Sequence, residues 1–390
     1  MDRTLAKELD PNTTFLTDSA AQTLCGVFEA SGYRAYFVGG CVRNAVMGVP
    51  ITDIDIATDA TPQTTISICT DAGFRCVPTG IDHGTITVLV QDHAFEVTTF
   101  RKDVTTDGRR AVVAFSTDLT EDAHRRDFTM NALYADMRGQ ISDPVEGYDD
   151  AVSRRVRFID DAGQRIREDY LRTLRYFRFN AQYAGGEVAW DADALDGIAA
   201  NLSGLETLSA ERVGAEMAKL LAAPDPYPAL CVMQQTGVLS CILPGADPAF
   251  VGPLVHLETN HLLPIDPIAR LAALGGADAS ERLRLSRADQ RHLDSIRVYS
   301  VSSDTPKAVG HLAGAKVGRA AILLRSAYAN VPLENEALTQ VEEGADAVFP
   351  ISARDLPHLS GAALGAELKR IKQVWLASDL TKSKEQLLTP

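Results

Sequence analysis

A chain of 390 residues is long for one hydrophobic core, so its length predicts two to four domains. Its 45% hydrophobic and 23% charged residues are ordinary for a soluble globular protein, and no apolar run approaches the roughly 20 residues of a membrane span. The formal net charge of −14 argues against a protein that coats long polyanions.

The acidic excess is unevenly distributed along the chain. Between Arg101 and Arg178 the basic and acidic side chains are equal in number, at 15 each. Within residues 154–178, 8 arginines stand against 4 acidic residues. This local basic surface predicts a polyanionic partner that is gripped at one place.

The six cysteines are scattered and include no Cys-x-x-Cys pair, so neither a zinc site nor a disulfide framework is predicted. The first eight residues lack the apolar core of a signal peptide. We therefore expect a reduced cytoplasmic protein that does not associate with a membrane.

The first 160 residues mix helices and strands. A helix capped by Thr17 or Asp18 is expected to end near Gly32. The turn-like segment 91–93 predicts that the strands on either side of it form a hairpin. Strands are predicted at 35–38, 53–57, 85–90, 95–100 and, more weakly, 112–115.

After Glu168 strand alternation largely disappears and helical periodicity takes over. Proline-bearing segments divide this half into helical blocks. The periodicity is clearest at 211–222, 267–274, 316–329 and 362–377. The sequence therefore predicts an α/β head followed by an all-α remainder.

Two aspartates, Asp53 and Asp55, lie in the second predicted strand. Side chains at i and i+2 of a strand point to the same face, so both carboxylates should project together. The preceding Gly39-Gly40 turn can expose backbone N–H groups to phosphate. Hard oxygen ligands beside such a turn predict Mg²⁺-dependent chemistry on a nucleoside triphosphate. For the pair alone, a solvated Asx turn at a strand end is the alternative.

A third acid, Glu96, shares a strand face with Thr98. If its strand neighbours that of Asp53, Glu96 completes a cluster of three carboxylates. On its own, the residue is equally well explained as a surface glutamate on an edge strand.

An arginine-rich segment at 124–133 combines Arg125, Arg126 and Asp127. Arginine offers forked donors to a triphosphate or a ribose, and Asp127 offers an acceptor to a sugar hydroxyl. A surface cluster of salt bridges is the alternative explanation.

A third segment, 165–179, has the pattern of an amphipathic helix. Asp169, Arg172 and Tyr176 fall at i, i+3 and i+7, which places them on one helical face. This face could read a nucleotide base, or it could hold no more than an internal Asp–Arg pair.

In their order and rough spacing, these segments resemble the motifs of class II tRNA nucleotidyltransferases, the CCA-adding enzymes, a family that also contains bacterial poly(A) polymerases. With a further helical motif at 208–216, the resemblance covers about residues 35–220, whereas the C-terminal half is similar only loosely. Six motifs carry the resemblance, at 39–43, 53–58, 79–85, 96–101, 125–132 and 168–175.

The resemblance implies an α+β fold with a polymerase-β-type nucleotidyltransferase head at 1–160, a helical neck for base recognition at 161–225, and a helical body and tail for tRNA binding at 226–390. It implies attack of a tRNA 3′-hydroxyl on the α-phosphate of CTP or ATP, without a nucleic-acid template and with release of pyrophosphate. Which residues contact the tRNA stays unknown at this stage.

The resemblance also implies two Mg²⁺ ions at Asp53 and Asp55, with Glu96 assisting the metal that activates the hydroxyl. Residues 102–124 would form a mobile loop used in moving from C to A addition. The nucleotide-binding residues implied are Gly39, Gly40, Arg43, Arg126, Asp127, Asn131, Asp169, Arg172, Arg175 and Arg178.

Base choice would rest on Asp169 and Arg172. Cytosine and adenine both present an exocyclic amine beside a ring-nitrogen acceptor, whereas uracil and guanine present a carbonyl and a ring N–H. Asp169 would accept from the amine and Arg172 would donate to the ring nitrogen.

One position departs from the family pattern, because Asn44 stands where an Asp usually follows the arginine. Asn keeps an acceptor but loses a charge that would pair with an arginine, so the orientation of Arg43 is in doubt.

Three alternatives stay open. A poly(A) polymerase is the nearest, although the tail has only small basic clusters and segment 76–80 lacks a Gly-Arg-Arg-Phe run. An enzyme that adds only CC or only A is the second. The third is an inactive RNA-binding adaptor, which the intact carboxylates argue against.

Overall fold

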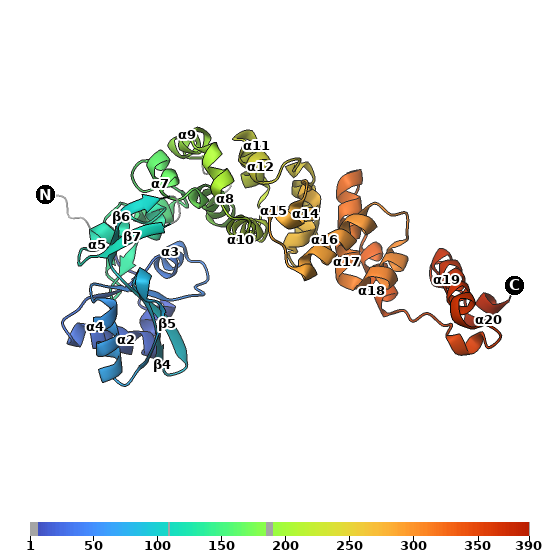
Figure 1. Ribbon diagram of the computed structural model, residues 1–390, viewed down its shortest axis with the longest axis horizontal. Coiled ribbons are helices and arrows are strands. Elements are labelled where there is room, and N and C mark those ends of the chain that lie inside the picture. Colours follow the sequence, from blue (N-terminus) through green and yellow to red (C-terminus); the bar gives the residue numbers. More distant parts are fainter. Residues whose placement is uncertain (1–6, 108–109, 185–189, 390) are drawn as a thin grey trace. The chain divides into compact units, whose positions relative to one another are not determined.

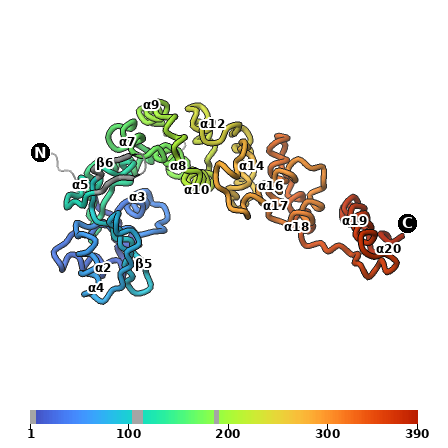
Figure 2. The backbone as a smooth tube through the Cα atoms, in the orientation of Figure 1, coloured from blue at the N-terminus to red at the C-terminus, as the bar shows by residue number. Residues whose placement is uncertain are grey.

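The chain folds as two compact units, Met1–Leu208 (unit 1) and Ser209–Pro390 (unit 2), shown in Figures 1 and 2. The computed structural model describes residues 7–107, 110–184 and 190–389, with the backbone alone for 103–107 and 110–113. The predicted boundaries after residues 160 and 225 fall inside these units, so the division into head, neck and body stays a prediction.

Unit 1 is built on a seven-stranded sheet with the order β3-β4-β5-β2-β1-β8-β9. Strands β2 and β5 pair in parallel, and the other neighbours pair antiparallel. The strands are β1 (Ala35–Val38), β2 (Asp55–Thr58), β3 (Arg75–Gly80), β4 (Thr85–Val90), β5 (His93–Thr99), β8 (Tyr134–Ala135) and β9 (Ile141–Ser142).

Two helices, α2 (Ser19–Ala30) and α4 (Pro62–Asp71), pack against one face of this sheet (Figure 1). Asp18 caps α2 as predicted, since its side chain accepts from the N–H of Ala21. Burial alternates along β4, where Ile86 is buried and Thr87 is partly exposed. Asp55, Thr87 and Glu96, which alternate with the buried side chains of these strands, therefore lie on the face opposite the helices.

The remaining elements of unit 1 include a separate two-stranded hairpin of β6 (Arg101–Asp107) and β7 (Arg110–Phe115). The other elements are α1 (Thr14–Thr17), α3 (Gly40–Met47), η1 (Ile81–His83), α5 (Leu119–His124), η2 (Thr129–Asn131), α6 (Tyr148–Val152), α7 (Ala162–Glu168), α8 (Leu171–Tyr183), α9 (Ala192–Ala200) and η3 (Leu202–Thr207).

Several local predictions for unit 1 are confirmed and others are wrong. The hairpin of β4 and β5 is confirmed. The second strand begins at Asp55 and not at Asp53, so Asp53 precedes it. Residues 102–124, predicted to be a mobile loop, contain most of the β6–β7 hairpin and all of α5, while residues 108–109 lie outside the described part, so the use of this segment in moving from C to A addition stays a prediction.

The predicted single helix over 165–179 is two helices. α7 ends at Glu168, Asp169 is extended with φ −153°, and α8 begins at Leu171. The Asp169 carboxylate accepts from the N–H of Leu171 at 3.1 Å and so starts the second helix.

Unit 2 is helical throughout its described residues, which confirms the predicted all-α remainder. In this part of the chain, and in the described residues of unit 1, no helix is both long and apolar enough to cross a bilayer. The helices are α10 (Ala210–Leu221), α11 (Tyr227–Gln235), α12 (Val238–Ile242), η4 (Pro248–Phe250), α13 (Val251–Asn260), α14 (Pro267–Leu274), α15 (Ala279–Arg282), α16 (Arg287–Ser300), α17 (Pro306–Ala329), α18 (Asn335–Asp346), η5 (Ala353–Asp355), α19 (Gly361–Ala377) and α20 (Lys384–Leu388).

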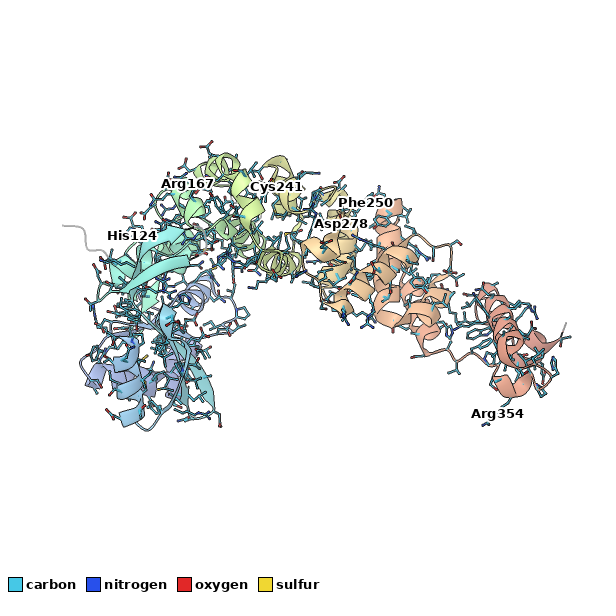
Figure 3. The ribbon with its side chains drawn as sticks, viewed as in Figure 1. His124, Arg167, Cys241, Phe250, Asp278 and Arg354 are labelled. Atoms are coloured by element: carbon cyan, nitrogen blue, oxygen red, sulfur yellow. The ribbon has the colours of Figure 1, made fainter. Side chains whose placement is uncertain are left out.

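Proline- and aspartate-initiated turns connect these helices, and aromatic contacts join them. Asp266 caps α14, with Pro267 at its first position. Phe250, labelled in Figure 3, meets the ring of Tyr328 edge-on with 4.9 Å between centroids.

A buried ion pair lies in the interior of unit 2. The Arg270 side chain is 1% exposed, and its Nε donates to Glu258 Oε2 at 2.9 Å. Arg270 Nη1 also donates to the carbonyl of Leu221 at 2.7 Å, which ties α14 to the end of α10.

We expect Arg270→Met to destabilise the chain by about 3–5 kcal/mol, because it leaves the Glu258 carboxylate buried without its cation. Urea unfolding followed by circular dichroism measures this change. The matched control is Arg284→Met, since the Arg284–Glu211 pair is more than 60% exposed on both sides and should contribute less than about 1 kcal/mol. Equal losses in the two variants would contradict the prediction.

Candidate active site

A glycine turn joins β1 to α3 at one edge of the site. Gly39 has φ +71°, which side chains other than glycine rarely adopt. A Cβ at this position would lie 3.4 Å from Arg126 Nη1. The turn therefore leaves the first N–H groups of α3 open to the close approach of an anion.

A cavity of about 340 Å³ lies beside this turn. Nine of the ten predicted nucleotide-binding residues line it. The exception is Arg178, whose Nη1 donates to Gln182 Oε1 and whose guanidinium lies 4.3 Å from the ring centroid of Phe179. The lining residues are Gly39, Gly40, Arg43, Asp55, Arg125, Arg126, Asp127, Asn131, Asp169, Arg172, Arg175 and Phe179.

Besides Asp55, which is predicted as a metal ligand, two lining residues, Arg125 and Phe179, were not among the predicted site residues. Arg125 lies in the same arginine-rich segment as Arg126, so adjacency in that segment was the available signal. Phe179 follows Arg175 by four positions on α8, which places both side chains on one face.

The parallel pairing of β2 with β5 brings two of the predicted carboxylates together. Asp55 and Glu96 are direct partners in the register, as are Glu96 and Thr87 on the next strand. Asp53 lies just before β2, where its Oδ2 accepts from Thr52 Oγ1 at 3.0 Å.

These carboxylates border a second cavity of about 590 Å³. Asp55 lines both cavities, whereas Asp53 and Glu96 line only the second. The lining residues of the second cavity are Thr52, Asp53, Ile54, Asp55, Thr87, His93, Ala94, Phe95 and Glu96.

The Asp55 carboxylate has an electrostatic environment that disfavours its charge. Protein atoms surrounding the concave site remove part of its hydration and raise its pKa, although the residue remains accessible to water. The neighbouring charge of Glu96 and the more weakly acting Asp53 raise it further, while Arg126 opposes them. A cation placed among these oxygens would relieve the repulsion.

The donor set suits a hard divalent cation, because it consists of carboxylates alone. Among the described residues, however, no three His, Cys, Asp or Glu side chains converge closely enough to make a metal site by themselves. The predicted cluster is thus a close pair, Asp55 and Glu96, with Asp53 at the same cavity.

Asp127 is buried, and both of its oxygens are bound. Oδ2 accepts from Arg175 at 2.5 and 2.7 Å, while Oδ1 accepts from the N–H of Phe128 and from Asn131 Nδ2. Burial opposes ionisation, but Arg175 and the hydrogen bonds outweigh it and lower the pKa of Asp127 to about 2. In this structure Asp127 holds Arg175 and Asn131, both of which line the cavity.

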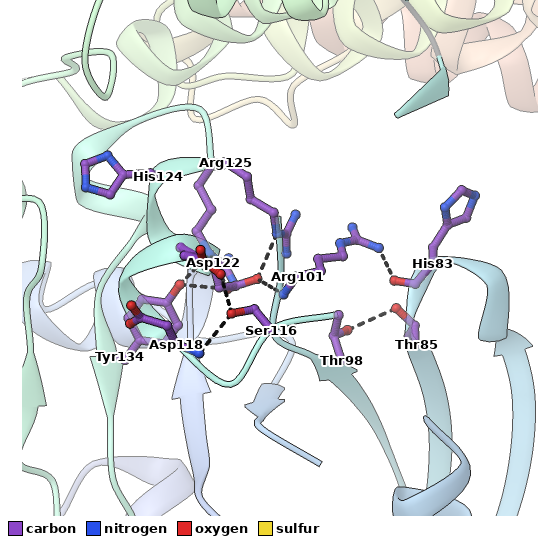
Figure 4. A network of polar contacts seen from close by, with 12 residues as sticks. His83, Thr85, Thr98, Arg101, Ser116, Asp118, Asp122, His124, Arg125 and Tyr134 are labelled. Carbon is purple, nitrogen blue, oxygen red and sulfur yellow. Dashed lines mark hydrogen bonds and ion pairs between the residues drawn. The ribbon is translucent and has the colours of Figure 1, made fainter. Parts of the chain in front are cut away.

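Asp122 of α5 holds the two arginines that follow it (Figure 4). Its buried carboxylate accepts from Arg125 at 2.7 Å, from Arg126 at 2.9 Å and from Tyr134 Oη at 2.7 Å. It also accepts from the N–H of Arg101, at the start of the β6–β7 hairpin. Burial acts to raise its pKa, yet the two arginines hold it well below the usual range.

The predicted base-reading residues are brought to the cavity from the junction of α7 and α8. Arg172 Nη1 donates to Glu168 and to the carbonyl of Arg165, and Nη2 donates to the carbonyl of Arg125. Its guanidinium is therefore fixed in orientation beside Asp169 at the cavity wall.

Tyr176 does not share this face, contrary to the prediction. It is fully buried and stacks on Phe158 with 5.5 Å between centroids. Tyr176 lies on α8 together with Arg172, but it is turned about 40° around the helix axis toward the core, whereas Arg175 and Phe179 turn the other way, toward the cavity.

Comparison with protein families matches two parts of the chain. Residues 35–157 match the Poly A polymerase head domain. Residues 191–250 match the family described as the probable RNA and SrmB-binding site of polymerase A.

Relatives with known names match over most of the chain or over its first part. CCA tRNA nucleotidyltransferase 1, mitochondrial, of Danio rerio is 31% identical over 385 residues, covering 94% of this chain and 89% of the relative. Its Homo sapiens namesake is 32% identical over 409 residues, covering 97% and 91%. The CCA-adding enzyme of Geobacillus thermodenitrificans is 43% identical over 216 residues, covering 55% and 52%.

Solved structures share the fold. The Bacillus stearothermophilus CCA-adding enzyme in complex with CTP has a TM-score of 0.73 at 25% identity, covering 94% of both chains. The Thermotoga maritima CCA-adding enzyme complexed with tRNA has a TM-score of 0.71 at 18% identity, covering 98% of this chain and 97% of that one. The chain therefore belongs to the class II tRNA nucleotidyltransferases, the family of CCA-adding enzymes.

Proposed function

We propose that this chain adds C, C and A to the 3′ end of tRNA, from CTP and ATP, without a nucleic-acid template and with release of pyrophosphate. The observation that carries the proposal is the position of Asp55, which lines both cavities. One carboxylate can thus act on a nucleotide in the first cavity and on a second substrate in the other. The relatives matching nearly the whole chain are named for this activity.

The first cavity would hold the nucleoside triphosphate. The N-terminus of α3 at Gly39 and Gly40 faces it, as do Arg43 and Arg126, which supply positive charge. The ribose would lie near Asn131 and Asp127, the latter acting by holding Arg175 in place.

The second cavity would receive the 3′-terminal nucleoside of the tRNA. Thr87 and His93 offer a hydroxyl and an imidazole at its wall, and Glu96 lies next to Asp55. The tRNA 3′-hydroxyl would lose its proton and attack the α-phosphorus from this side, as the bond to the pyrophosphate oxygen breaks on the other.

Asp53, Asp55 and Glu96 would hold Mg²⁺, with two ions expected. When bound, the metal supplies positive charge that neutralises the triphosphate and lowers the pKa of the attacking hydroxyl. The residues of the chain position the two substrates around it.

Base choice would depend on the Asp169 carboxylate beside the Arg172 guanidinium. Of the Arg172 donors, Nε–H and one Nη2–H make no hydrogen bond to a described residue, so they are available to a base. Cytosine and adenine present the matching donor and acceptor, whereas uracil and guanine would turn a carbonyl toward the Asp169 carboxylate and an N–H toward the Arg172 guanidinium.

Asp169→Ala should therefore let UTP compete with CTP, with the ratio of kcat/KM values falling about tenfold or more, because the carboxylate that disfavours the carbonyl of a mismatched base is removed. Incorporation of each labelled nucleotide into truncated tRNA measures this ratio. The control is Asp196→Ala, which removes an exposed carboxylate on α9. Unchanged discrimination in Asp169→Ala would place the base-reading groups elsewhere.

The activity itself is tested by offering CTP or ATP separately to tRNA transcripts that lack three, two or one of the terminal nucleotides. A CCA-adding enzyme takes CTP on the first two and ATP on the third. Addition of many successive A residues to all three transcripts would indicate a poly(A) polymerase. Addition to only some of the transcripts would indicate a CC-adding or an A-adding enzyme. No incorporation together with tRNA binding would indicate an adaptor.

The cytoplasm is the compartment we propose. All six cysteines belong to the described part of the chain and are free; three are buried and three are partly exposed. The vertebrate relatives are named mitochondrial, so cell fractionation with compartment markers is the appropriate test.

A further inference from the structure

Arg43 is a buried guanidinium held by uncharged groups. Its side chain donates twice to Asn44 Oδ1, at 2.8 and 3.1 Å, and once each to Asn131 Oδ1 and to Tyr183 Oη. It also lies 4.2 and 5.2 Å from the ring centroids of Tyr183 and Phe179. Arg43 is only 6% exposed.

The other arginines that line the nucleotide cavity all have carboxylate partners. Arg125 and Arg126 pair with Asp122, Arg172 pairs with Glu168, and Arg175 pairs with Asp127. No carboxylate oxygen of a described residue lies within 4.0 Å of the Arg43 guanidinium. Asp127 acts on it only at longer range, with both oxygens held by other groups.

The Asn44 amide accounts for this difference. Its Nδ2 donates to the carbonyl of Pro50 at 2.7 Å, which requires an N–H donor on that side and turns Oδ1 toward Arg43. A carboxylate could not donate to Pro50, and it would add a negative charge beside the guanidinium. Asn44 thus orients Arg43 without neutralising it.

We propose that Asn44 is a positioning residue that keeps the charge of Arg43 uncompensated, so that this guanidinium discriminates in favour of the triphosphate over less charged nucleotides. The inference rests on the proposed binding of CTP in the first cavity. It assigns to Asn44 a function in affinity for phosphate and none in the chemical step.

The physical reason is competition for one cation. A carboxylate at position 44 would form a charge-assisted bond with Arg43, and the triphosphate would have to share or displace it. A buried guanidinium that begins without a counter-ion gains more from the incoming phosphate, because no existing ion pair is weakened when the ligand binds. The effect should grow with the charge of the ligand.

The test compares the full-length chain with its Asn44→Asp variant by calorimetric titration with CTP, CMP and inorganic pyrophosphate. We expect Asn44→Asp to weaken CTP and pyrophosphate binding about tenfold. The binding of CMP should weaken much less, so the ratio of the affinity for CTP to the affinity for CMP should fall. A loss shared equally by CTP and CMP would overturn the proposal.

Two further variants separate charge from shape. Asn44→Ala removes the acceptor and the bond to Pro50 without adding charge, so it should retain more pyrophosphate affinity than Asn44→Asp; an equal loss would overturn the charge argument. Asn201→Asp is the matched control, because the Asn201 amide also donates to a backbone carbonyl at 2.7 Å but lies outside the cavity. It should leave all three affinities unchanged.

The outcomes distinguish this inference from the proposed function. If the wild-type chain fails to bind CTP, the proposed function fails and the inference fails with it. If the wild-type chain binds CTP and Asn44→Asp binds CTP equally well with an unchanged melting temperature, only the inference about Asn44 is overturned.

Discussion

Asp55→Asn should lower kcat for CTP incorporation by about a thousandfold while leaving the chain folded. The substitution keeps the shape of the side chain and removes the negative charge that both cavities share. It also removes the repulsion from Glu96 that raises the Asp55 pKa, so the melting temperature should stay the same or rise. Loss of activity with equal or greater stability is the signature of a residue retained for chemistry.

The measurement is single-nucleotide addition to truncated tRNA, with thermal unfolding of the same protein followed by circular dichroism. Asp71→Asn serves as the control, because Asp71 is an exposed carboxylate at the end of α4 in the same unit. Incorporation by Asp55→Asn at the wild-type rate would refute the assignment of the carboxylates. A large fall in the melting temperature would instead make Asp55 a structural residue.

Asp122→Ala should destabilise unit 1 by about 3–5 kcal/mol, because it leaves Arg125 and Arg126 without their common carboxylate. The loss should also raise KM for CTP, since both arginines line the nucleotide cavity. Denaturant unfolding measures the first effect, and initial rates over a range of CTP concentrations measure the second.

Tyr134→Phe provides the graded comparison for Asp122. It removes the hydrogen bond to the carboxylate and the one that Tyr134 Oη accepts from Arg126 Nε, and it should cost about 2 kcal/mol. Asp160→Ala is the surface control. Asp160 pairs with His124, which lies on α5 like Asp122, but the side chains of Asp160 and His124 are both nearly half exposed. An Asp122→Ala protein as stable as the Asp160→Ala protein would show that the arginines do not depend on this carboxylate.

Local patterns in the sequence were enough to place most of the chemistry. The i, i+2 argument identified Asp55 and Glu96 on strand faces, and parallel pairing of the two strands then made them neighbours. The pattern could not show that β2 begins only at Asp55, because an isolated short apolar run fixes strand boundaries poorly.

The errors in the third segment have separate causes. Periodicity continues through 165–179, so it conceals the extended conformation of Asp169 that divides α7 from α8. On a continuous helix with 100° per residue, Arg178 lies about 120° around the axis from Arg172, and this rotation carries it away from the cavity. The unpredicted helix α3 was hidden by its first residues, because Gly39 and Gly40 suggested a turn alone.

The long-range contacts around Asp122 and Arg43 were beyond sequence reasoning for another reason. Asp122 meets Arg125 and Arg126 at helical spacing, but its bond from Tyr134 joins residues whose separation along the chain carries no periodic signal. The same is true of the bond between Arg43 and Tyr183. Only the folded arrangement shows which carboxylate neutralises which arginine, and therefore which arginine is left for a ligand.

The parallel pairing of β2 with β5 has a consequence for biosynthesis. Asp55 leaves the ribosome well before Glu96, and β5 can pair with β2 only after the crossover through α4, β3 and β4 has been synthesised. The wall of the nucleotide cavity is complete only when Phe179 has been translated. A nascent chain that ends before Phe179 should therefore not bind CTP. Such an incomplete polypeptide would be inactive and could not add nucleotides to an RNA.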